Sequence, residues 1–128
     1  MSVLSPILAP ENSFTLTRGA NKTLQLTVTN PDATATNLTG CKLILSVKSD
    51  QYDELPLIPK LSTIPAQGSI TKPREGLAEF YFVPSDTLGL TPKSYIYDVW
   101  LITTTGDQFP VVSTSNLVLL AGVTYLPK

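Results

Sequence analysis

The sequence predicts an all-β protein, and three observations lead to that prediction. Short runs of alternating apolar and polar residues follow one another from Ser13 onward, clusters of turn residues separate them, and no run keeps a helical period. The length of 128 residues, with 42% hydrophobic and 15% charged residues, is typical of one globular domain. We therefore expect a β-domain over residues 13–123, between an N-terminal arm of residues 1–12 and a C-terminal tail of residues 124–128.

The first three strands are predicted by strict alternation. Phe14 and Leu16 alternate with threonines, and residues 24–29 continue with apolar side chains at every second position. Residues 30–40 are rich in turn formers and predict a loop. The third strand follows that loop and places Leu43, Leu45 and Val47 on one face, which we expect to be buried.

The middle of the chain is less regular because prolines interrupt it. Between residues 49 and 74 the prolines are Pro56, Pro59, Pro65 and Pro73, and a proline removes a hydrogen-bond donor from a strand. This segment is therefore expected to be an edge strand or a loop. Residues 76–83 alternate again and predict a strand, and residues 84–90 favour one helical turn.

The last part of the chain returns to strands. Residues 93–103 are the longest candidate, with Tyr95, Tyr97 and Val99 on one face and Trp100 on the other. Further strands are expected at residues 108–112 and 116–123. About seven short strands with regular turns predict an immunoglobulin-like antiparallel β-sandwich. In that fold either Tyr95 or Tyr97 could form a tyrosine corner, in which the phenol bonds back to loop backbone.

Composition excludes several classes of partner. Nine Lys plus Arg against ten Asp plus Glu give a net charge of −1 without clustering of either sign, which argues against nucleic acid and anionic membranes as partners. No run reaches the length of a membrane span, and the first ten residues lack the basic start of a signal peptide. The single Cys41 can form no intramolecular disulfide. We expect a soluble protein made in the cytoplasm.

Residues suited to catalysis are scarce. The chain has no histidine, which excludes histidine-based general-base and Ser-His-Asp chemistry. Asp50, Asp53 and Glu54 match no calcium-loop motif, Glu75 and Glu79 have the character of ordinary solvent-facing carboxylates, and Cys41 is better explained by packing than by reactivity. The prediction is a protein without enzymatic activity, cofactor or metal.

Apolar residues at the two ends and one tryptophan are the candidate contacts with other molecules. An arm lying on a neighbouring subunit would cover the ends, although packing on the chain's own domain would do so as well. Trp100 could be an interface anchor, a contact to the second sheet or a platform for a sugar ring, or it could be buried under the proline-rich segment. The candidate interface residues are Val3, Leu4, Ile7, Leu8, Trp100, Tyr125 and Leu126.

A series of short motifs resembles one family. In order they are Phe14 to Gly19, Leu24 to Thr29, Leu38-Thr39-Gly40, Pro84 to Thr87 and Tyr95 to Val99. Together they resemble the N-terminal domain of phage baseplate upper proteins and related small immunoglobulin-like phage structural proteins. The family continues into long C-terminal segments, whereas this chain is predicted to be one domain with an N-terminal arm and a longer proline-rich insertion. A neck, tail or capsid adaptor is therefore as compatible with it as a baseplate protein.

The resemblance implies a non-enzymatic virion protein that is made in the host cytoplasm. It would assemble with itself, as a homo-oligomer in the particle, and with other virion proteins of the tail, baseplate, neck or capsid. The alternative is a carbohydrate-binding sandwich that uses exposed aromatic residues such as Trp100.

Overall fold

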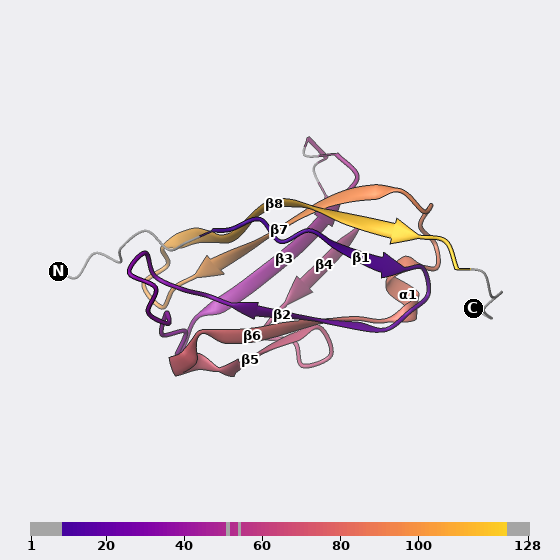
Figure 1. Ribbon diagram of the computed structural model, residues 1–128. Coiled ribbons are helices and arrows are strands. Elements are labelled where there is room, and N and C mark those ends of the chain that lie inside the picture. Colours follow the sequence, from indigo (N-terminus) through magenta and orange to yellow (C-terminus); the bar gives the residue numbers. More distant parts are fainter. Residues whose placement is uncertain (1–8, 51, 54, 123–128) are drawn as a thin grey trace.

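The computed structural model describes residues 9–50, 52–53 and 55–122, and it consists of two β-sheets packed face to face (Figure 1). The five-stranded sheet has the order β1 (Phe14–Thr17), β8 (Gln108–Leu120), β7 (Ser94–Ile102), β3 (Lys42–Lys48) and β4 (Ile58–Leu61). The three-stranded sheet has the order β2 (Lys22–Thr27), β6 (Leu77–Phe82) and β5 (Gly68–Lys72). The predicted immunoglobulin-like β-sandwich is confirmed, with eight strands in the described residues.

One strand pair departs from the predicted antiparallel arrangement. β1 runs parallel to β8, with Phe14 opposite Leu117, while every other named pair in the described residues is antiparallel. Alternation fixes which face of a strand is buried but carries no information on the direction of its neighbour.

The core lies between the sheets and follows the predicted alternation. In β3 the buried side chains are Leu43, Leu45 and Val47, and in β7 the buried face carries Tyr95, Tyr97, Val99 and Leu101. The facing sheet contributes residues such as Phe80, which has no exposed surface. Complete burial of each large apolar side chain stabilises the fold by roughly 1.5–3 kcal/mol, so this core is the main source of stability.

Strand β8 differs from the prediction of two separate strands. It runs without a break from Gln108 to Leu120, although its register against β7 shifts between Tyr97 and Trp100. Val111 and Val112 are both buried, which interrupts the alternation at this point. A β-bulge inserts a residue in this way without ending the strand.

The proline-rich segment forms an edge, as expected. β4 lies at the edge of the five-stranded sheet, and the exposed Pro59 is one of its four residues. β5 lies at the edge of the other sheet and is followed by a short 3-10 helix, η1 (Pro73–Glu75). Gly76 ends η1 with φ 69°, where a side chain would be strained and its Cβ would lie 2.4 Å from the Val28 carbonyl oxygen.

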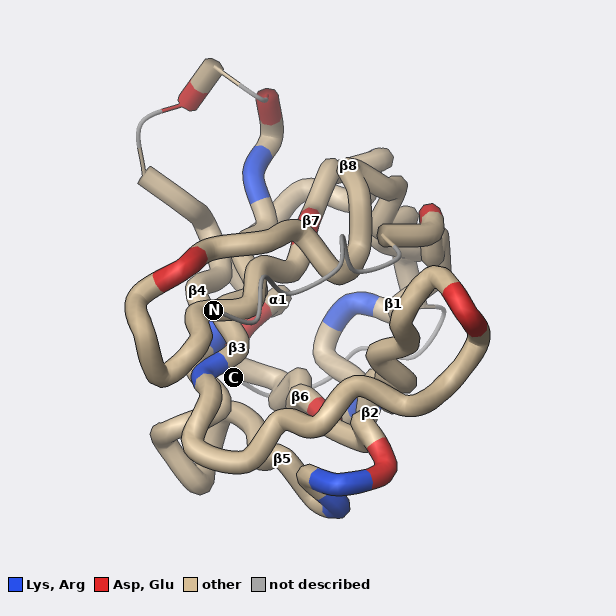
Figure 2. The backbone as a smooth tube through the Cα atoms, turned by 90° about the vertical axis from the view of Figure 1, so that its left-hand side faces the viewer, with Lys and Arg blue, Asp and Glu red and all other residues tan. Residues whose placement is uncertain are grey.

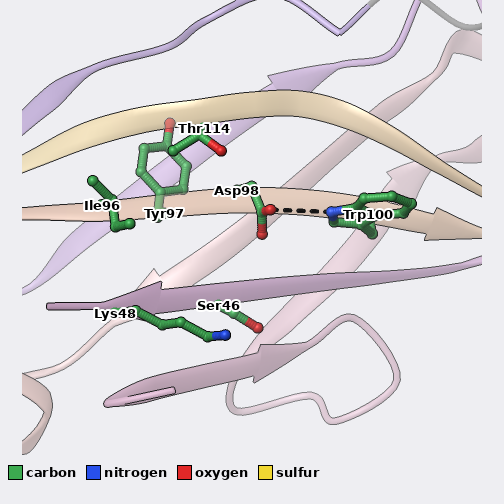
Figure 3. Close-up of a pocket in the computed structure, with 7 residues that line it drawn as sticks. All are labelled: Ser46, Lys48, Ile96, Tyr97, Asp98, Trp100 and Thr114. Carbon is green, nitrogen blue, oxygen red and sulfur yellow. Dashed lines mark hydrogen bonds between the residues drawn. The ribbon is translucent and has the colours of Figure 1, made fainter. Parts of the chain in front are cut away.

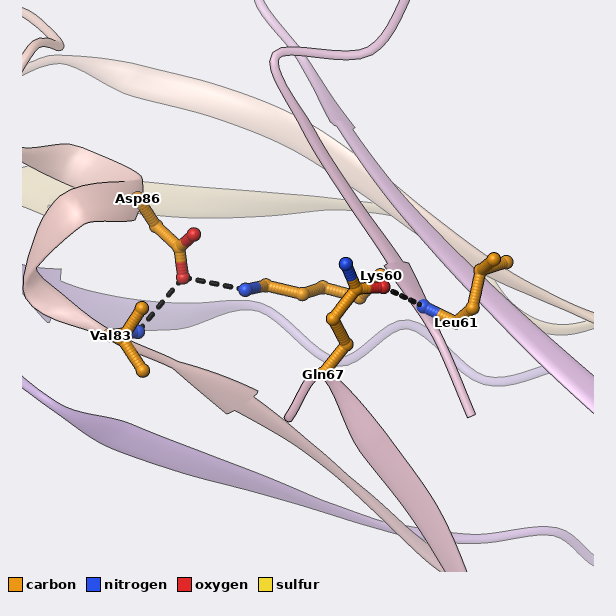
Figure 4. Close-up of polar contacts among 5 residues, drawn as sticks. All are labelled: Lys60, Leu61, Gln67, Val83 and Asp86. Carbon is orange, nitrogen blue, oxygen red and sulfur yellow. Dashed lines mark hydrogen bonds and ion pairs between the residues drawn. The ribbon is translucent and has the colours of Figure 1, made fainter. Parts of the chain in front are cut away.

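The predicted helical turn is α1 (Pro84–Thr87), and it joins the two sheets through a buried ion pair (Figure 4). Lys60 of β4 points inward, and its Nζ lies 2.7 Å from Asp86 Oδ2. The same carboxylate oxygen accepts a hydrogen bond from the Val83 N–H at 2.8 Å. The side chains are only 5% and 16% exposed, so the edge strand of one sheet is fixed to the connection that leaves the other.

Strands β1 and β2 lie at the opposite side of the sandwich from β4 (Figure 2). There the Phe14 ring packs against Phe82 at 5.8 Å and against Tyr97 at 5.2 Å, the latter edge to face. The Tyr97 hydroxyl donates a hydrogen bond to the Asn12 carbonyl. Residues 10–12 therefore lie along β8, where the Ser113 N–H also bonds the Pro10 carbonyl at 3.2 Å.

Of the two tyrosines considered for a tyrosine corner, Tyr95 has the required geometry. Its hydroxyl donates a hydrogen bond to the Thr91 carbonyl, four residues earlier, at 2.6 Å. Tyr95 stands at the start of β7, directly after the connection from β6, which is where this bond occurs in immunoglobulin-like domains.

Candidate interaction surface

Trp100 lies on the outer face of the five-stranded sheet, turned away from the core. Its neighbours Val99 and Leu101 are buried, whereas the Trp100 side chain is 39% exposed. The indole Nε1–H donates a hydrogen bond to Asp98 Oδ2 at 3.1 Å, and this bond holds the ring against the sheet. The position excludes both burial of Trp100 under the proline-rich segment and a contact between Trp100 and the second sheet.

Strand register places three further apolar residues in line with Trp100. Ile44 lies opposite Trp100 on one side and opposite Leu61 on the other, and Pro110 lies opposite Trp100 on β8. All are partly exposed, because directly opposed residues share a face of the sheet. We call Leu61, Ile44, Trp100 and Pro110 the apolar row. It crosses four adjacent strands of a face that is expected to be polar where it meets water.

A pocket of about 300 Å³ adjoins the apolar row (Figure 3). Ser46 lies opposite Asp98 and Lys48 opposite Ile96, so β3 and β7 supply its floor. Trp100 and Ile96 stand toward its two ends along β7. The full lining is Ser46, Lys48, Ile96, Tyr97, Asp98, Trp100 and Thr114. The Lys48 ammonium donates a hydrogen bond to the Asp53 carbonyl at 2.8 Å, which anchors the loop that follows β3.

The residues weighed for catalysis or metal binding are apart or engaged elsewhere. Glu79 accepts a hydrogen bond from the Tyr81 hydroxyl at 2.6 Å, and Glu75 belongs to η1 rather than to the same strand. The Asp53 carboxylate accepts the Asp50 N–H at 3.0 Å within a turn, and Glu54 lies outside the described residues. Within the described part of the chain, no group of three or more His, Cys, Asp or Glu is placed to hold a metal ion.

Cys41 is half-buried, directly precedes β3 and packs against the core. Burial raises the pKa of its thiol, which keeps the less nucleophilic protonated form. This environment agrees with a packing role.

Of the predicted interface residues, Trp100 is the one that the structure describes. Val3, Leu4, Ile7, Leu8, Tyr125 and Leu126 lie outside the described residues. The rest of the apolar row was missed at the sequence level. Ile44 could have been found from its position between buried Leu43 and Leu45, but Leu61 and Pro110 join it only through register.

Among the described residues, no helix has the length and apolar character needed to cross a membrane.

Comparison with known proteins gives little beyond this. No family model and no curated protein matches the chain. A solved structure of murine CRIg is similar with a TM-score of 0.41 and 16% identity, over 91% of this chain and 96% of that one. A likeness at this level carries no argument about function. The immunoglobulin-like class rests on the strand order and pairing described above.

Proposed function

We propose that the chain is a non-enzymatic structural module that docks other proteins through the outer face of its five-stranded sheet. The observation that carries this proposal is the apolar row, in which Trp100 is flanked by Ile44 and Pro110 on adjacent strands. Tryptophan is enriched among the residues that dominate binding energy at protein interfaces. The side chain is pre-ordered by its bond to Asp98, so less entropy is lost when a partner covers it.

The setting of this module comes from the resemblance to phage baseplate upper proteins. We place it in a bacteriophage virion, as an adaptor or attachment component of the tail, baseplate, neck or capsid that contacts other virion proteins and copies of itself. In a symmetric particle a modest interface on each copy is sufficient, because linked contacts raise one another's effective concentration. The absence of histidine from the sequence supports a role without catalysis.

The test is incorporation into particles by a phage whose own copy of the gene carries Trp100→Ala. We expect a loss of roughly 30-fold in the amount per particle, corresponding to about 2 kcal/mol for an interface anchor, measured by quantitative mass spectrometry. Leu120→Ala is the matched control, because Leu120 is an exposed apolar residue of β8 outside the apolar row. Normal incorporation of Trp100→Ala, and also of Trp100→Ala combined with Ile44→Ser, would refute the docking face.

The pocket beside Trp100 favours a second candidate, the binding of a carbohydrate. An exposed indole could stack on a sugar ring while Asp98, Ser46 and Thr114 offer hydrogen bonds, and the volume of about 300 Å³ is at the lower end for ligand pockets. Ser46→Ala combined with Thr114→Ala separates the two functions, because it removes two hydroxyls from the pocket and leaves the bond between Trp100 and Asp98 in place. The double variant should abolish binding on a glycan array if the pocket takes a sugar, but it should leave particle incorporation within about twofold if the apolar row docks a protein.

A further inference from the structure

Strand β2 lies at an edge of the three-stranded sheet. Among the described residues its hydrogen-bonded neighbour is β6 alone, and the register between them runs without a shift from Lys22 to Thr27. The edge strands at the opposite side of the sandwich, β4 and β5, carry features that hinder pairing with a further strand. β4 contains Pro59, and the pairing of β5 with β6 is irregular between Ser69 and Lys72. Proline, bulges, short length and charged side chains, above all lysine, are the usual protections against edge-to-edge pairing. Of these β2 has only Lys22, at its first position, and the five residues that follow carry none.

The hydrogen bonds at the end of β2 show which backbone groups face outward. The Val28 N–H donates to the Gly76 carbonyl at 2.8 Å, one position beyond the pair of Thr27 with Leu77. In an antiparallel pair the bonded residues alternate, so Leu24 and Leu26 also direct their groups to β6. Thr23, Gln25 and Thr27 therefore direct their N–H and C=O groups away from the sheet.

We propose that this edge pairs with β2 of a second copy of the chain, antiparallel, with Gln25 opposite Gln25 of that copy. Thr23 then lies opposite Thr27, and every outward N–H and C=O of the three residues finds a partner. The pairing joins the two three-stranded sheets into one continuous sheet around a two-fold axis. In this register even-numbered residues pair with even-numbered ones and odd with odd. Leu24 and Leu26 therefore remain on the core side of the joined sheet.

The side chains of β2 fit a second copy better than an unrelated strand. In the proposed register threonine faces threonine, a favourable cross-strand pair. Lys22 carries the only charge in the strand, and it falls opposite Val28, so no like charges are directly opposed. Shifting the register by two residues in either direction leaves outward backbone groups of this segment unpaired.

Sedimentation of the full chain tests the dimer, over protein concentrations from about 10 µM to about 1 mM, where weak interfaces dissociate. Gln25→Pro removes an outward N–H without touching the bonds to β6 and should weaken the dimer roughly tenfold or more. Gln25→Thr keeps the N–H and should dimerise as the wild type does. A monomer throughout this range, or equal dimerisation of the Gln25→Pro chain, would overturn the proposal.

Two charged variants at position 25 test the same dimer even if Gln25→Pro fails to fold. Gln25→Lys and Gln25→Glu each place like charges opposite one another at the two-fold axis, and each should weaken the dimer roughly fivefold or more. An equal mixture of the two variants places opposite charges there and should recover wild-type association. Failure of the mixture to recover it would count against the register.

Cross-linking measures the register directly. Directly opposed residues of a hydrogen-bonded pair have Cα atoms about 5.5 Å apart, within reach of a disulfide. Gln25→Cys should therefore form a covalent dimer on oxidation. Thr23→Cys should not, because the two substituted positions would lie about 13 Å apart along the strands. The wild type, with Cys41 alone, sets the background, and equal cross-linking of both variants would contradict the proposal.

This inference is independent of the docking function proposed above. Trp100→Ala should leave the dimer unchanged, because the apolar row lies on the other sheet. A dimer that Trp100→Ala abolishes and Gln25→Pro preserves would assign self-association to the outer face and overturn the edge pairing alone.

Discussion

Different interactions hold the two sheets together at the two sides of the sandwich. At the β4 side the contact between the sheets is the ion pair of Lys60 with Asp86, and at the β1 side it is the packing of Phe14 on Phe82 and Tyr97. Phe82 takes part in both, because its ring centroid lies 5.8 Å from the Lys60 ammonium and 5.8 Å from the Phe14 ring.

The difference lies in how each contact fails. A buried ion pair that loses one member leaves the other as an unpaired buried charge, which costs more than the pair contributes. An aromatic contact loses stability gradually, because each atom that a substitution removes takes away only its own share of buried surface and dispersion energy. Substitutions at the β4 side should therefore be much less tolerated than comparable ones at the β1 side.

The largest effect is expected for Asp86→Ala. This change leaves the Lys60 ammonium buried without a partner and removes the acceptor of the Val83 N–H. We expect a loss of roughly 3–5 kcal/mol in the free energy of unfolding, measured by urea denaturation.

The matched control is Lys60→Met combined with Asp86→Asn. It removes both charges, keeps an unbranched side chain only one atom shorter at position 60, and retains an oxygen that can accept the Val83 N–H. Its stability should lie within about 1 kcal/mol of the wild type. A double variant as unstable as Asp86→Ala would mean that the ion pair itself contributes this stability, and that the unpaired charge does not account for the loss.

An intermediate effect is expected for Phe14→Ala at the other side. Phe14 is only partly buried, and its two aromatic contacts are each worth about 0.5–1.5 kcal/mol beyond burial, so the loss should be roughly 2–3 kcal/mol. Phe14→Leu keeps most of the bulk and should lose about half as much. Equal losses in the free energy of unfolding for the two variants would show that the aromatic geometry of Phe14, rather than the volume it fills, stabilises this side.

These two sides also show how much of the fold the sequence predicts. Alternation placed Leu43 and Leu45 on a buried face and put Tyr97 and Trp100 on opposite faces of their strand, because a side chain's face depends on its own strand. Which of those two faces belongs to the core was left open. Proline likewise limited the segment that contains β4 to an edge strand or a loop. The buried Lys60 was not predicted, since a lysine between Pro59 and Leu61 has the pattern of a solvent-facing residue and its partner is 26 positions away.

The candidate surface was predictable only in part, for a related reason. Trp100 was singled out as the aromatic residue on the face of its strand opposite Tyr95 and Tyr97, with an interface as one of several possible uses. Its neighbours Ile44, Leu61 and Pro110 come from three other strands, and their alignment depends on register. Register in β8 is further altered by the bulge near Val111 and Val112, which no alternation pattern predicts.

The smallest effect is expected for Tyr97→Phe, and it depends on pH. The change removes the hydroxyl that bonds the Asn12 carbonyl, so at pH 7 the loss in the free energy of unfolding should be about 1 kcal/mol. Burial is the main influence on the pKa of Tyr97 and raises it above the ordinary value of 10.0. The folded protein therefore keeps its proton at pH values where the unfolded chain has released it.

The upward direction of the pKa shift determines the pH range in which Tyr97 affects stability. Below about pH 10 the tyrosine is protonated in both states, and its contribution to stability is complete. Above pH 10 ionisation favours the unfolded chain, so the wild type loses roughly 1 kcal/mol for each pH unit from this residue. A phenylalanine at this position cannot ionise, so the Tyr97→Phe variant does not lose this stability. Urea denaturation should therefore show that the free energies of unfolding of the variant and the wild type become equal near pH 11.

Tyr52→Phe is the control, since the Tyr52 side chain is 84% exposed, and its stability should follow that of the wild type at every pH. A difference that stays constant from pH 7 to pH 11 would mean that Tyr97 ionises as readily in the folded protein as in the unfolded chain, and that the β1 side is open to water.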